Sequence, residues 1–188
     1  MKQNRSIFFA FGFLIISASL YRIWDGRPLG FAPQIAMAIF AGAVIKKKQW
    51  AFILPILSLF ISDTLYHVLY INGLTEISGF YSGQFTNYLL FGGLVAIGFL
   101  IKNIKVSSVL LASLAAPTAY FMVSNLLVWL NGGGFARPKT LDGLILCYAD
   151  AMPFYRGSLV GTLVFSTILF GGFYLIQQFV LKNKSQLA

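Results

Sequence analysis

The sequence has few charged residues, and acidic ones are the scarcest. Only 10% of its 188 residues are charged, and five of them are Asp or Glu. A typical soluble domain carries roughly 25% charged residues. Because 58% of the residues are hydrophobic, we expect lipid to surround most of the chain. In lipid, backbone hydrogen bonds must be satisfied within each segment, so the expected fold is an all-α transmembrane bundle, with residues 1–188 as one domain.

Cysteine and histidine are also scarce, since Cys147 and His67 each occur once. One cysteine cannot form an intrachain disulfide, and this pair cannot supply a multi-His or Cys-based metal centre. We therefore expect no metal site and no cofactor. The motifs Gly-x-Ser-x-Gly, His-Glu-x-x-His and Gly-x-x-x-x-Gly-Lys are absent too. This absence excludes an ATPase in this sequence and favours a protein that is not an enzyme.

What the sequence does contain is a series of six apolar segments. A spanning helix needs roughly 20 mostly apolar residues. The second segment is short and rises only about 18 Å from 34 to 45, so we expect a tilted or partly re-entrant helix that starts after Pro33. The first could be a signal peptide with small residues at 17–19, but we favour a retained helix. The segments are 7–24, 31–45, 50–71, 85–101, 106–130 and 158–181.

Basic residues gather at one set of segment ends. Nine Lys or Arg and no acidic residue lie there, whereas the other ends mix basic and acidic residues. The positive-inside rule therefore predicts that this set, with both termini, is cytoplasmic. Short clusters between apolar runs differ from the continuous basic face of a nucleic-acid-binding protein, so no nucleic-acid partner is expected. The nine are Lys2, Arg5, Lys46, Lys47, Lys48, Lys102, Lys105, Lys182 and Lys184.

The longest link, residues 131–157, lies on the predicted outer side and is rich in apolar and aromatic residues. Loops of this length are usually functional or disordered, and this composition argues against disorder. We expect a folded cap on the outer face. A short helix over 140–149 is predicted within it, with Thr140 as its N-cap and Asp142 in its first turn.

The most informative polar residue is Asp63, deep within the third segment. It lies roughly 20 Å along the helix from Trp50, and a carboxylate at that depth normally faces a bundle interior or a wet cavity. His67 follows at i+4, on the same helix face. Two interpretations stay open: a ligand or proton-relay site, or a buried carboxylate that is satisfied by an arginine or a helix end.

Other polar and aromatic residues lie in the outer halves of the segments and in the outer loops. Ligand sites combine apolar and aromatic walls with a few polar groups, so this asymmetry predicts an outward-facing cavity beneath the loops. An interfacial aromatic belt is the alternative interpretation for the Trp and Tyr residues. The candidate ligand-binding residues are Asp63, His67, Asn125, Trp129, Arg137, Tyr148, Asp150 and Arg156.

Pairs of small residues four positions apart recur in the segments, as in Ala38/Gly42 and Gly157/Gly161. Such pairs let helix backbones approach closely in lipid. They predict tight packing either within the chain or against a partner membrane subunit.

Four stretches carry a resemblance to a known family: 31–43 (FAPQIAMAIFAGA), 57–63 (LSLFISD), 124–129 (SNLLVW) and 147–157, which includes PFYRG. They resemble an uncharacterised family of small bacterial membrane proteins, over nearly the whole chain. That family is distantly similar to the substrate-binding S components of energy-coupling-factor transporters. The resemblance implies a multi-pass protein of the bacterial inner membrane that captures a small molecule and works with a partner subunit. Leu14 interrupts the small residues expected on the first helix for docking such a subunit.

The leading functional hypothesis is therefore a membrane-embedded component that binds or transports a small solute. A structural or assembly subunit of a larger membrane complex is the first alternative. An intramembrane enzyme that uses Asp63 and His67 is the second, and it requires the two side chains to converge.

Overall fold

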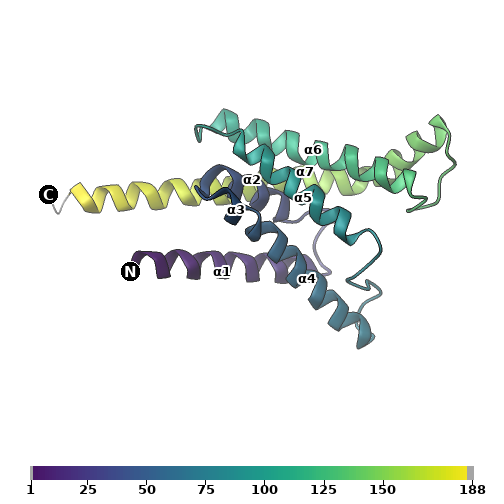
Figure 1. Cartoon of the computed structure of the whole chain (residues 1–188), viewed down its shortest axis with the longest axis horizontal. Helices are drawn as coiled ribbons and strands as arrows, with labels where there is room; N and C mark the ends of the chain where they lie inside the picture. Colours follow the sequence, from purple (N-terminus) through teal and green to yellow (C-terminus); the bar gives the residue numbers. More distant parts are fainter. Residues whose placement is uncertain (1, 186–188) are drawn as a thin grey trace.

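The computed structural model describes residues 2–185, and every regular element within them is a helix. The one-turn helix α3 leads almost directly into α4, so six helical segments form the bundle in this range, as the sequence predicts (Figure 1). The helices are α1 (Lys2–Ile23), α2 (Gln34–Val44), α3 (Lys48–Ala51), α4 (Ile53–Ile71), α5 (Gln84–Phe99), α6 (Val106–Leu130) and α7 (Leu141–Ser185).

Three stretches of helix are long and apolar enough to cross a membrane: Lys48–Ile71, Val106–Leu130 and Leu141–Gln178. The apolar helices Ala10–Ile23, Gln34–Val44 and Gln84–Phe99 are shorter. Length and composition therefore define a helical membrane protein. Six crossings and cytoplasmic termini stay predictions.

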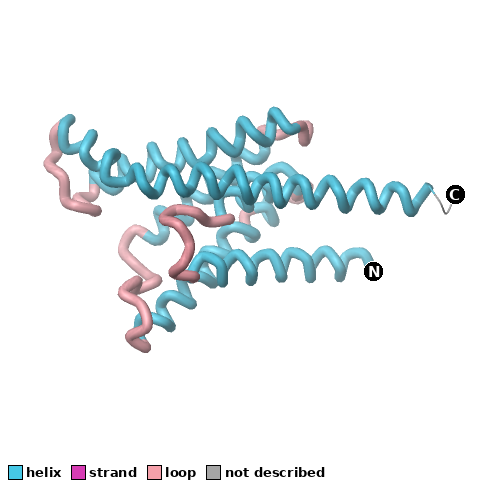
Figure 2. The backbone as a smooth tube through the Cα atoms, turned by 180° about the vertical axis from the view of Figure 1, so that it is seen from behind, coloured by secondary structure: helices cyan, strands magenta, loops and turns pink. Residues whose placement is uncertain are grey.

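Both ends of the chain lie on one side of the molecule (Figure 2). The links 45–47 and 100–105 lie on this side too, and we call it the basic end because of its lysines. The links 24–33, 72–83 and 131–140 lie on the opposite side, which we call the loop end. Helices that alternate between these two ends are what the charge pattern predicts.

The short helix α2 forms the centre of the bundle. Residues 34–42 are buried, and α4, α5, α6 and α7 all contact it. Its 11 residues rise only about 16 Å. The surrounding helices shield it from lipid, so its length does not have to match the bilayer thickness. As predicted, it begins directly after Pro33.

Small residues bring backbones into contact at several places, and the pairs singled out in the sequence supply two of them. A Cβ on Gly42 would overlap the carbonyl oxygen of Val95, so α2 and α5 touch backbone to backbone. A Cβ on Gly157 would overlap the carbonyl oxygen of Leu29, so the link 24–33 lies directly on α7. Both small-residue pairs singled out in the sequence are therefore used inside the chain.

Helix α7 differs from its prediction in length. It begins after Thr140, whose Oγ1 accepts a hydrogen bond from Gly143 N at 3.2 Å, and Asp142 lies in its first turn. It does not end near 149 but continues through Pro153 to Ser185, so the predicted short helix and sixth segment are one element. The first turns are inclined to the rest (Figure 1), because a proline removes one helical hydrogen bond and bends the helix. Whether 131–157 caps the outer face stays a prediction.

Candidate functional site

Asp63, on α4, is only 2% exposed, and other helices supply partners for both of its carboxylate oxygens. Oδ1 accepts a hydrogen bond from Arg22 of α1, with which Asp63 forms an ion pair. Oδ2 accepts hydrogen bonds from Gln84 and, at 2.9 Å, from the hydroxyl of Tyr88, both on α5. Arg22 also donates to Ser62 Oγ at 2.6 Å. We call these five residues the Asp63 network, and it joins α1, α4 and α5 towards the loop end.

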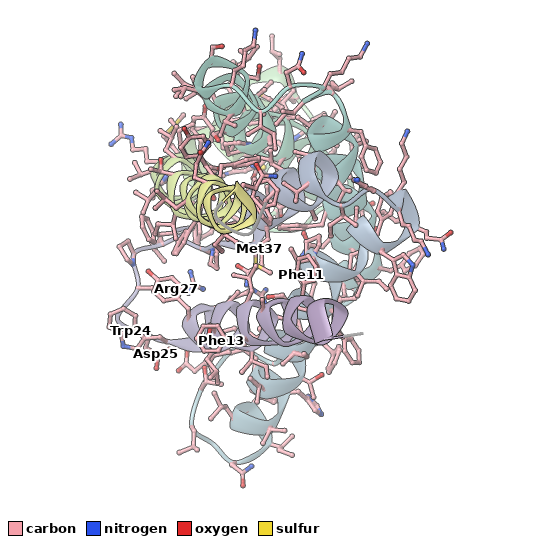
Figure 3. All side chains as sticks on the ribbon, turned by 90° about the vertical axis from the view of Figure 1, so that its left-hand side faces the viewer. Phe11, Phe13, Trp24, Asp25, Arg27 and Met37 are labelled. Carbon is pink, nitrogen blue, oxygen red and sulfur yellow. The ribbon has the colours of Figure 1, made fainter. Side chains whose placement is uncertain are left out.

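The link after α1 extends the Asp63 network. Arg27 Nε and the hydroxyl of Tyr66 both donate to the Arg22 carbonyl oxygen, at 2.6 and 2.8 Å. Figure 3 shows Arg27 turned inward, whereas Trp24 and Asp25 lie at the periphery. The charge of Asp63 is therefore matched by an arginine, which is the second of the two interpretations left open by the sequence.

His67 lies one turn further along α4 and serves a different contact. Its side chain is exposed, its Nδ1 lies 3.1 Å from Ser78 O, and its ring meets Phe80 edge to face at 5.6 Å. Gly79, at φ 77°, lies against the α4 backbone where a Cβ would overlap Asp63 O. His67 thus holds the link 72–83 on α4, and its side chain does not converge with that of Asp63.

A cavity of about 350 Å³ lies between α6 and α7 towards the loop end. We call it the α6–α7 cavity. It begins near Pro117, midway along α6, and ends at Phe135 in the link 131–140. Phe121 and Tyr155 stack in its wall with ring centroids 4.5 Å apart. The lining residues are Pro117, Tyr120, Phe121, Ser124, Asn125, Val128, Gly134, Phe135, Cys147, Asp150, Ala151, Phe154, Tyr155 and Ser158.

An ion pair closes one side of the α6–α7 cavity. Arg137 donates to both carboxylate oxygens of Asp150, at 2.8 and 2.9 Å. These side chains are 34% and 25% exposed, so the pair is far more open than that of Asp63. The hydrogen bonds to Asp150 raise the pKa of the Arg137 guanidinium. The paired charges leave the cavity with little net charge.

Two further hydrogen bonds hold the rim. Trp129 Nε1 donates to Pro138 O at 2.8 Å, and the hydroxyl of Tyr148 donates to Met122 O at 2.7 Å. The first ties the link 131–140 to α6, and the second ties the start of α7 to α6. The shape of the cavity therefore depends on side chains from both helices and from the link between them.

The polar groups inside the α6–α7 cavity are few. Asn125 Nδ2 donates to Phe121 O at 2.8 Å. The hydroxyl of Tyr155 shares a hydrogen bond of 2.9 Å with Thr118 Oγ1. A guest would meet aromatic faces, one amide and hydroxyl groups, which is the usual composition of a small-molecule site.

Five of the eight candidate residues gather around this cavity. Asn125 and Asp150 line it, and Trp129, Arg137 and Tyr148 hold its rim. The other three lie elsewhere: Asp63 belongs to the Asp63 network, His67 contacts the link 72–83, and Arg156 is exposed on α7.

Most of the aromatic wall was not predicted from the sequence, although a signal was present. The lining positions on α7 are 147, 150, 151, 154, 155 and 158, which is the spacing of one helix face. Positions 121, 124, 125 and 128 repeat that spacing on α6. The face on α7 is recognisable only if residues 141–157 are treated as helix and not as a loop.

The structure thus defines a helical membrane protein with a cavity in its bundle. The chain belongs to a family of unknown function, DUF6580, whose profile matches residues 2–185. This confirms the expected membership in an uncharacterised family. No curated protein and no solved structure matches the chain, so these comparisons give no support to a similarity with S components.

Proposed function

We propose that this protein is a multi-pass protein of the bacterial inner membrane that binds a small solute in the α6–α7 cavity. The observation that carries the proposal is the cavity itself, about 350 Å³ with aromatic walls. Ligand pockets have volumes of roughly 300–1,000 Å³. Five residues chosen from the sequence for ligand binding line or frame this space.

The chemistry of the cavity favours an uncharged and partly apolar solute. Asp150 is paired with Arg137, so a charged guest would find no free counter-ion there. The stacked rings of Phe121 and Tyr155 offer apolar faces, and Asn125 Oδ1 offers an acceptor. A planar solute with one or two hydrogen-bond donors would satisfy both features.

The direction of capture follows from the charge pattern. If the basic end is cytoplasmic, the cavity lies in the outer half of the membrane and takes its solute from the outer side. No phosphate-binding ATPase motif occurs in the sequence, so transport driven by ATP would depend on a partner subunit. We therefore propose a binding component, with transport as its further role.

A matched pair of variants tests the proposal. Ala151 lines the cavity, whereas Ala149 is exposed on the same helix. Ala151→Leu fills the cavity, and Ala149→Leu adds the same bulk outside it. Native mass spectrometry after gentle extraction should detect a small-molecule adduct on the wild type and on Ala149→Leu, and none on Ala151→Leu. An equal adduct on both variants would exclude this cavity as the site.

A further inference from the structure

A second cavity, of about 570 Å³, lies between α6 and α7 near the basic end. Two of its lining residues are Ser113 on α6 and Ser166 on α7, each 1% exposed. Neither hydroxyl has a hydrogen-bond partner in the described part of the chain. A buried hydroxyl without a partner is destabilising, so two of them in one cavity indicate a guest that accepts hydrogen bonds.

The unpaired hydroxyls are unusual for this bundle. Serine and threonine in a helix commonly donate to the carbonyl oxygen four residues earlier. Thr118 and Thr167, on the same two helices, do so at 2.7 and 2.9 Å. Ser113 and Ser166 line the same space, and neither hydroxyl makes this bond or any other within the described residues.

The mouth of this cavity is suited to an anion. Lys105, an exposed lining residue, immediately precedes α6, whose first turn has no side-chain cap. Free N–H groups and the helix dipole make such a terminus a binding site for phosphate. The lysine adds a full positive charge, and no acidic residue occurs in the link 100–105.

Between the mouth and the hydroxyls the wall is apolar, with Val109, Leu110 and Phe170. Ser113 lies seven residues beyond Val106, which corresponds to about 10 Å along the helix. A glycerol backbone with a hydrogen bond at each end can bridge that distance. The site thus suits a guest with an anionic group at the mouth, hydrogen-bond acceptors about 10 Å deeper, and apolar surface against the wall.

We propose that this cavity binds an anionic glycerophospholipid from the membrane leaflet at the basic end. Its phosphate lies at Lys105 and the first turn of α6, and its ester carbonyls accept hydrogen bonds from Ser113 and Ser166. Its acyl chains cover the apolar wall. A free phosphate ion would satisfy the mouth alone and leave both hydroxyls unpaired. The proposal is independent of the solute site, which lies towards the opposite end of the same helix pair.

The test compares variants of the full chain in detergent with added phosphatidylglycerol, phosphatidylcholine of the same acyl chains, or inorganic phosphate. The variants are Ser113→Ala/Ser166→Ala and Lys105→Gln. Thr64→Ala is the hydroxyl control, because Thr64 is exposed and bonded within its own helix. Lys46→Gln is the charge control, because Lys46 is exposed on another basic link. The readouts are lipid retained in native mass spectra and the lipid-dependent shift in melting temperature.

Phosphatidylglycerol should stay bound to the wild type and to both controls, and should raise their melting temperature. The loss of two hydrogen bonds should weaken binding by about tenfold or more. The loss of Lys105 should weaken it by about fivefold. Without lipid, Ser113→Ala/Ser166→Ala should melt at a higher temperature than the wild type, because two unpaired buried hydroxyls are removed.

Three outcomes would overturn the proposal. If inorganic phosphate stabilises the wild type as much as the lipid does, the site binds an anion and does not require a lipid. If the serine variant retains as much lipid as the wild type, the two hydroxyls do not contribute to lipid binding. A lower melting temperature of the lipid-free serine variant would show that the hydroxyls have partners inside the protein. Ala151→Leu should leave lipid retention unchanged, which separates this result from that of the solute site.

Discussion

The Asp63 network and the surroundings of Asp150 both lie towards the loop end, yet their carboxylates have different environments. Asp63 is 2% exposed, and α1 and α5 pair both of its oxygens. Asp150 is 25% exposed, is bonded to Arg137 and lines a cavity of about 350 Å³. A buried charge in an apolar bundle must be enclosed by partners. A site for a guest needs polar groups beside open space, and of these two carboxylates only Asp150 lines a cavity.

One segment of backbone separates these two regions. Arg27 of the link 24–33 contacts the Asp63 network, and three residues later Gly30 O accepts a hydrogen bond from Ser158 of the cavity wall, at 3.2 Å. A Cβ on Gly30 would overlap Phe154 O, so the link lies directly on α7. Residues 27–32 therefore lie between the Asp63 network and the α6–α7 cavity.

The largest effect on stability is expected for a change of the buried carboxylate, Asp63. Asp63→Ala leaves Arg22 without its counter-ion, and Arg22 is only 20% exposed. Breaking a buried ion pair in this way should lower the free energy of unfolding by about 3 kcal/mol. Asp150→Ala should cost less than about 1 kcal/mol, because exposed pairs contribute little. Unfolding curves in micelles measure the free energy of unfolding of both variants. Equal decreases would show that the two carboxylates contribute equally to stability.

The contact between the link 24–33 and α7 supplies the second prediction. Gly157→Ala places a methyl group against Leu29 O and must push the link away from α7. Overpacking of this kind costs about 1–3 kcal/mol, again measured by unfolding in micelles. Gly171→Ala is the control on the same helix, since a Cβ there meets nothing within 4 Å. The control should be neutral, or more stable by up to about 1 kcal/mol because alanine favours helix. A Gly157→Ala variant as stable as the wild type would mean that the link does not touch α7.

The smallest stability effect is expected at the rim of the cavity. Arg137→Gln removes the partner of Asp150 but should change the free energy of unfolding by less than about 1 kcal/mol, because the pair is exposed. It leaves a negative charge beside the bound solute, so the adduct of the wild type should weaken or disappear in native mass spectra. Arg156→Gln removes a charge from an exposed position on the same helix and serves as the control. An unchanged adduct on Arg137→Gln would place the solute away from this pair.

Helix positions could be predicted where the residues that set the ends of a helix lie within it or directly beside it. The predicted segment 106–130 coincides with α6, and 50–71 nearly coincides with Lys48–Ile71, because apolar length and flanking lysines mark these ends in the sequence. The start of α7 at Thr140 was predicted from its N-cap. Its continuation through 150–157 was not predicted, because packing on α6 stabilises those turns and composition suggested a loop.

The sequence allowed the region of the candidate site to be predicted, but not which side chains contact one another there. Asn125, Trp129 and Arg137 were chosen for their predicted depth and chemistry, and they do gather at one end of α6. Depth counted along a single helix cannot identify partners on other helices. For that reason Arg22 and Gln84 were not recognised as the partners of Asp63.

The sequence alone identifies this protein as a helical membrane protein, because its apolar runs are long and its charges are few. It also determined that a carboxylate at position 63 must face inward, since lipid cannot solvate it. The groups that meet that carboxylate, and the places where open space remains, are set by the packing of the helices against one another. Those outcomes depend on contacts between helices far apart in the chain, and no local pattern of residues encodes them.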